Sequence, residues 1–166
     1  MDGESYLYSL VEAGVALAGF SAIALALGSR RTHQGEVHQK VIVARLVERS
    51  LMSSLFALLP TLLSGLDLSE RIVWLIASGS LAAYGALRLI QTLRTRRDTI
   101  AHLGIRQTSI FFLGLIAVAV IIVQILNAFG VVLSQGLWWY AFGVTWLLVS
   151  AGYTFVVYLR AWIRAS

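Results

Sequence analysis

Glu12 is the residue in this chain whose type and position could do chemistry inside an apolar segment. It lies six residues after Tyr6, with which that segment begins. In a helix, Glu12 would therefore lie about 9 Å inside the segment, measured from its outer end. A carboxylate at that depth in a membrane is costly unless it faces protein or water, and it is therefore a candidate transport group. The alternative is a structural carboxyl that joins one helix to another by hydrogen bonds.

Other polar side chains lie at a similar depth in later apolar segments. Gln124 lies six residues before Gly130, and Asn127 lies one helical turn nearer to that end; Thr145 lies seven residues after Trp138. Polar side chains in lipid gain from hydrogen-bonding each other across helices. We therefore expect Glu12, Gln124, Asn127 and Thr145 to form one polar cluster.

The first apolar segment also carries a stripe that could line a pore. At helical spacing, one face presents Ser9, Glu12, Ala16, Gly19, Ile23, Ala26 and Arg30. Repeated around a symmetry axis, this face would give an acidic outer ring, an apolar constriction and a basic inner mouth, which are the elements of a cation channel. The alternative is a packing face whose arginine extends to the interface.

Small residues at intervals of four predict close helix packing. The series in the first segment is Gly14, Ala18, Ala22 and Ala26, and a shorter one in the third is Gly79 and Ala83. Such positions let another backbone approach closely. Val118 and Ile122, in contrast, are expected to face lipid or larger side chains.

Catalytic and metal-binding patterns are missing from the sequence. There is no cysteine, and no match to the P-loop, the His-Glu-x-x-His or the Gly-x-Ser-x-Gly pattern. His33, Glu36 and His38 do not have a metal-ligand spacing. Ser50, Ser53 and Ser54 form a polar patch that is expected to bond back to its own helix. We therefore expect no enzyme, no metal and no cofactor.

The elements that position these residues follow from composition. Of the 166 residues, 58% are hydrophobic and 13% are charged, whereas soluble domains carry about 25% charged residues. Apolar runs long enough to cross a bilayer as helices cover residues 6–28, 46–66, 72–90, 110–129 and 138–159. The sequence thus predicts an all-α membrane bundle of five transmembrane helices, forming a single domain over residues 1–166.

The helices and their ends can be predicted more closely in places. Apolar residues at helical spacing extend the second helix back to about Glu36, and the third is expected to continue through Arg88 towards Arg97. Gly65 is expected to end the second helix, and Asn127 with Gly130 the fourth.

Charge predicts the orientation. All Lys and Arg residues except Arg71 fall on one side of the predicted membrane, out of 13 in the chain. The positive-inside rule then places the N-terminus outside and the C-terminus in the cytoplasm. This arrangement explains the net charge of +5 without a nucleic acid partner, and Arg94, Arg96 and Arg97 are placed to meet anionic lipid headgroups. Because Asp2 and Glu4 precede the first segment, we expect that segment to be retained rather than cleaved as a signal peptide.

Four stretches carry a resemblance to a known family: VEAGVALAGFSAIALAL, LMSSLFALLPTLLSGLDLSE, IIVQILNAFG and WWYAFG. They resemble a family of small, multi-span bacterial membrane proteins. The resemblance implies a multi-pass protein of the bacterial inner membrane and supplies no activity or site residue.

Three functions remain open from the sequence. The leading prediction is a homo-oligomeric channel or pore for small ions, in which Glu12 is the key carboxylate. The first alternative is a small proton-coupled exporter that uses Glu12, since intramembrane carboxylates serve as coupling groups. The second alternative is a structural or accessory membrane subunit that transports nothing.

Overall fold

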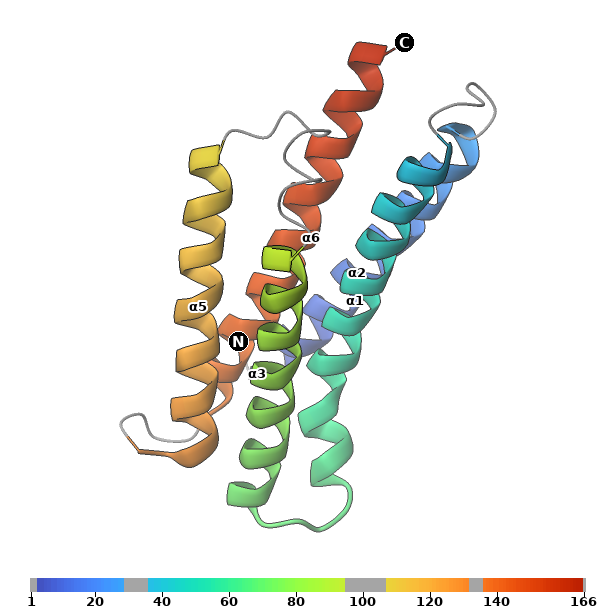
Figure 1. The fold of residues 1–166 in the computed structure, drawn as a ribbon. Coiled ribbons are helices and arrows are strands. Elements are labelled where there is room, and N and C mark those ends of the chain that lie inside the picture. Colours follow the sequence, from blue (N-terminus) through green and yellow to red (C-terminus); the bar gives the residue numbers. More distant parts are fainter. Residues whose placement is uncertain (1–2, 29–35, 95–106, 132–135, 166) are drawn as a thin grey trace. The chain divides into compact units, whose positions relative to one another are not determined.

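Five long helices make up the regular structure of the residues that the computed structural model describes (Figure 1). The structure describes residues 3–28, 36–94, 107–131 and 136–165. The helices are α1 (Gly3–Gly28), α2 (Glu36–Ser64), α3 (Glu70–Arg94), α5 (Gln107–Phe129) and α6 (Leu137–Ala165). All five are long and apolar enough to cross a membrane, which confirms the predicted helix number and class.

The helix bounds agree with the sequence prediction where the structure describes them. α2 begins at Glu36, well before its apolar stretch starts at Ala44. α3 continues to Arg94; the predicted continuation towards Arg97 lies outside the described residues. These extensions arise because α2 and α3 each add polar, helix-forming turns to an apolar centre.

Two turns have backbone conformations that fix where helices end. α5 ends at Phe129, and Gly130 follows with a φ of 64° while its N–H donates to Leu126 O at 2.9 Å. That is the left-handed position that glycine favours after a helix. Between α2 and α3, Asp67 has a φ of 52°, a conformation that Asp tolerates better than most residues. Asn127, expected to help end α5, instead lies inside the helix with its side chain buried.

The chain forms two compact units, and their boundaries fall within α2 and α6. The first unit contains Met1–Leu58 and Leu147–Ser166, and the second contains Leu59–Trp146. In the first unit, α1 and α2 meet at a small-residue contact, where Gly14 lies against Ser50 and Ser54. The buried residues of α1 follow one another at steps of three or four: Leu7, Leu10, Gly14, Ala18 and Ser21.

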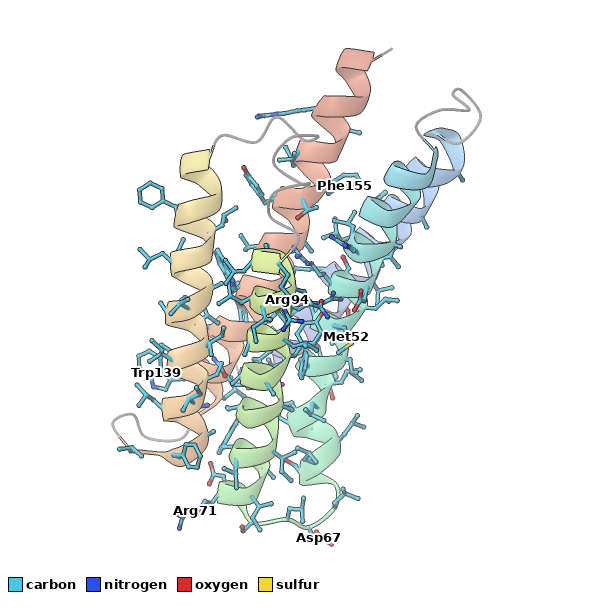
Figure 2. All side chains as sticks on the ribbon, in the orientation of Figure 1. Met52, Asp67, Arg71, Arg94, Trp139 and Phe155 are labelled. Atoms are coloured by element: carbon cyan, nitrogen blue, oxygen red, sulfur yellow. The ribbon has the colours of Figure 1, made fainter. Side chains whose placement is uncertain are left out.

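The second unit is organised around α3 and α5, which pack side by side in opposite directions (Figure 1). Successive positions of α3 meet successive positions of α5 in reverse order: Ser78 contacts Asn127, and Gly85 faces Ile121. The first turns of α6 complete this unit, with Tyr140, Ala141 and Val144 almost fully buried. Figure 2 shows Asp67 and Arg71 at one end of α3 and Arg94 at the other.

Large apolar side chains point outward along the helices. Phe20, Leu62 and Phe129 are each at least 60% exposed, and Val118 and Ile122 are exposed as expected. A soluble protein rarely exposes so many large apolar groups, whereas lipid-facing helices do. The surface of the helices is therefore compatible with a multi-pass membrane protein.

Candidate functional site

A buried polar network joins three helices of the second unit. Asn127 on α5 donates from Nδ2 to the Ser78 hydroxyl on α3 at 2.8 Å and to Gly136 O at 3.3 Å. In return, the Gly136 N–H donates to Asn127 Oδ1 at 3.0 Å. Ser78 and Asn127 are completely buried. One amide side chain thus holds α3, α5 and the start of α6 together.

Gln124 adds a second connection one turn away from Asn127 on α5. Its Nε2 donates to Trp139 O, in the first turn of α6, at 2.7 Å. The side chain is completely buried, and it fits because residue 143 is a glycine. A Cβ at Gly143 would lie 2.6 Å from Gln124 Nε2 and 2.9 Å from Leu81 Cδ2, distances that no real Cβ contact shows.

Aromatic side chains surround the same end of the second unit. The ring of Tyr140 is buried beside Trp74, with centroids 6.0 Å apart and planes tilted by 55°, an edge-to-face type of contact. Trp74 Nε1 donates to Glu70 Oε1 at 3.3 Å. Trp139, whose carbonyl accepts from Gln124, is itself 40% exposed at the start of α6 (Figure 2).

Of the four residues expected to form one polar cluster, two lie in this network. Gln124 and Asn127 are part of it, whereas the Thr145 hydroxyl donates to Ala141 O of its own helix at 2.8 Å. Glu12 belongs to the first unit, and its side chain is exposed. A contact between Glu12 and the other three residues stays a prediction.

The predicted stripe of α1 lies on the exposed side of that helix. Its described members are all exposed: Ser9, Glu12, Ala16, Gly19, Ile23 and Ala26; Arg30 lies outside the described residues. A Cβ at Gly19 would meet nothing within 4 Å. Counting 100° per residue, this stripe is centred on the side of α1 opposite to the buried set that includes Leu10 and Gly14.

The predicted small-residue series divides between these two sides. Gly14 and Ala18 are buried, but Ala22 and Ala26 are exposed. Each step of four residues turns about 40° beyond a full circle, so a series of such steps drifts off one face. In the third helix, Gly79 has open space around it and Ala83 is exposed, so this pair makes no close contact among the described residues.

Serines on α2 provide a feature that the sequence pattern described only in part. Ser50 Oγ donates to Leu46 O at 3.0 Å within its own helix, as expected. Ser54 Oγ, however, lies 3.1 Å from Val11 O on α1 as well as 3.3 Å from Ser50 O. The hydroxyl therefore links two helices, beside the position where Gly14 brings their backbones close.

Several groups of the buried network were not predicted from the sequence. Ser78 lies two turns into α3, a depth at which it could have been grouped with Asn127. Gly136 and Trp139 take part through backbone atoms, which no residue type can indicate. Nothing in the sequence around Gly143 distinguishes it from other small helix residues, and its role follows only from the packing of Gln124 against it.

No family model matches the chain, and neither a curated protein nor a solved structure is similar to it. The contacts of this molecule therefore carry the evidence for its function. Two features stand out: a buried network that satisfies itself almost completely, and an exposed carboxylate on α1.

Proposed function

We propose that the protein self-associates in a bacterial inner membrane and conducts small ions along the Glu12 face of α1. The observation that carries this proposal is the exposure of Glu12 on the side of α1 that does not pack within its own unit. The buried face of α1 contacts α2, so the carboxylate is directed away from that contact. The polar network of the second unit, by contrast, bonds mainly to itself and fits a structural role.

The physical reason is the cost of a carboxylate in hydrocarbon. Placing an ionisable side chain at the centre of a membrane helix costs roughly 2.5–3.5 kcal/mol or more, and such side chains face protein or water. Apart from Glu12 and Ile23, the exposed stripe consists of the small residues Ser9, Ala16, Gly19 and Ala26, which another helix can approach closely. A second copy of the chain would cover this face and set several carboxylates around one axis.

We also propose how the chain is oriented across the membrane. With the basic residues in the cytoplasm, Glu12 lies in the outer leaflet and Arg94 at the inner surface. Partners are then other copies of the chain, small ions and the anionic headgroups near Arg94. Nucleic acid binding and catalysis have no part in this proposal.

Ion flux into liposomes tests the proposed role of Glu12. The wild-type protein is expected to pass a passive cation current, and Glu12→Gln, which keeps the shape of the side chain but removes its charge, should reduce that current. Glu70→Gln is the matched control, because Glu70 is an exposed carboxylate at the start of α3 that accepts a hydrogen bond from Trp74 Nε1 of its own helix; the current of this variant should equal that of the wild type.

The same assay can contradict the proposal in three ways. Uptake that requires a pH gradient would indicate an exporter. Absence of any flux from well-folded protein would indicate a structural subunit. Equal currents in the wild type and Glu12→Gln would show that Glu12 has no part in conduction.

A further inference from the structure

The amide of Gln124 is satisfied on one side only. Nε2 donates to Trp139 O at 2.7 Å, while Oε1 is buried from solvent and receives no hydrogen bond from the described residues. The whole residue has no exposed surface. Buried acceptors in folded proteins nearly always have a donor, and an exception calls for a water or an ion.

The orientation of this amide is fixed, so exchanging its oxygen and nitrogen cannot provide the missing hydrogen bond. Trp139 O is an acceptor only, and it requires the N–H of Gln124 on its side. The atoms nearest to a Cβ placed on Gly143 are Nε2 at 2.6 Å and Cδ at 2.8 Å, so the nitrogen side of the amide is closely packed. Oε1 is directed away from that packed side.

Asn127, the neighbouring polar side chain on α5, has no hydrogen to spare. Its Nδ2 donates to Ser78 Oγ and to Gly136 O, and its Oδ1 accepts from the Gly136 N–H. An amide nitrogen has two hydrogens, and both are accounted for. The network therefore satisfies Asn127 completely and leaves the Gln124 oxygen as an acceptor.

We infer that one water molecule binds inside the second unit and donates a hydrogen bond to Gln124 Oε1. Water is the smallest neutral donor, and buried waters typically satisfy polar groups that the protein leaves unpaired. Leaving a buried acceptor unpaired is costly, and the surrounding hydrocarbon holds no bulk water that could pair with it instead. The site is independent of Glu12 and of the proposed conduction.

Water-edited solid-state NMR of the full chain in lipid bilayers tests this inference. Magnetisation that starts on water should reach the Gln124 side-chain amide several-fold more strongly than it reaches the Asn127 side-chain amide. Asn127 is the stringent control, because it is equally buried and lies closer to the end of α5. Transfer to Gln124 that is no stronger than to Asn127 would overturn the inference.

A variant and a salt exchange identify the occupant. Gln124→Met keeps the length of the side chain and removes the acceptor, so transfer from water to the side chain of residue 124 should fall to the Asn127 level; unchanged transfer would contradict a site at Oε1. If this variant does not fold, the wild-type comparison alone decides. A shift of the Gln124 signals when sodium is replaced by choline would show a bound cation instead and overturn the assignment of water.

Discussion

At the scale of single residues, two glycines of α1 differ in the space available for a side chain. Gly14 lies against α2 so closely that a Cβ would overlap Ser54 Oγ and come within 2.9 Å of Ser50 O. Gly19, five residues later on the same helix, has no atom within 4 Å of that position. The two glycines are alike in sequence context, and they differ only in what the fold places beside them.

Gly14→Ala should therefore destabilise the protein while Gly19→Ala should not. The added methyl group at residue 14 meets a backbone oxygen that cannot move alone, and overpacking of this kind costs about 1–3 kcal/mol. Unfolding in mild detergent by added dodecyl sulfate should show a lower midpoint for Gly14→Ala. Equal midpoints for the two variants would mean that α1 and α2 do not pack as described.

Asn127 is the second residue whose replacement has a definite expected cost. Asn127→Ala removes three hydrogen bonds and leaves the buried Ser78 hydroxyl and the half-buried Gly136 N–H without their partner, at an expected loss of about 1–3 kcal/mol. Ser80→Ala is the control, since Ser80 Oγ donates to Ala77 O of its own helix at 2.9 Å. In the same unfolding assay, the midpoint of Asn127→Ala should lie well below that of Ser80→Ala. The reverse order would show that the network is dispensable.

At the scale of helices, α1 has two opposite faces, one buried and one exposed. The buried face packs on α2 through small residues, and the exposed face carries Glu12. Helices that only face lipid gain nothing from small side chains, because lipid tails pack as well against Leu. The small residues Ala16, Gly19 and Ala26 of the exposed stripe, beside Glu12, are thus the reason to expect a second copy of the chain there.

Cysteine crosslinking tests this expectation, and the chain has no native cysteine to interfere. Ala16→Cys, on the exposed stripe, should form disulfide-linked dimers in membranes. Ala22→Cys is the control, since residue 22 is also exposed but lies about 120° around the helix from residue 16. Equal crosslinking at both positions would indicate random collision rather than a specific contact along the stripe.

At the scale of the whole molecule, the distribution of charge predicts which side of the membrane each connection occupies. The turn between α2 and α3 carries Asp67, and α3 begins with Glu70 and Arg71, whereas the far end of α3 carries Arg94, followed in the sequence by Arg96 and Arg97 (Figure 2). The positive-inside rule depends on such differences in short connections. It places the Asp67 turn outside and Arg94 inside.

Single-cysteine labelling measures this orientation directly. Leu66→Cys avoids the positive φ of the neighbouring Asp67 and is highly exposed, and Arg94→Cys is exposed at the opposite end of α3. An impermeant maleimide added to spheroplasts should label Leu66→Cys at once and Arg94→Cys only after permeabilisation. Labelling in the opposite order would reverse the proposed topology and place Glu12 in the inner leaflet.

The sequence by itself determined the helices of this protein, because apolar length and the positions of polar, glycine and charged residues are local properties. Five helices, the start of α2 at Glu36 and the end of α5 before Gly130 all follow from such local signals. Only the tertiary structure decided which polar groups meet. Asn127 pairs with Ser78 and with backbone atoms of Gly136, and Gln124 depends on the missing side chain of Gly143. The physical reason is that helix rotation and backbone approach choose the partners, and neither is encoded in the spacing of residues along one segment.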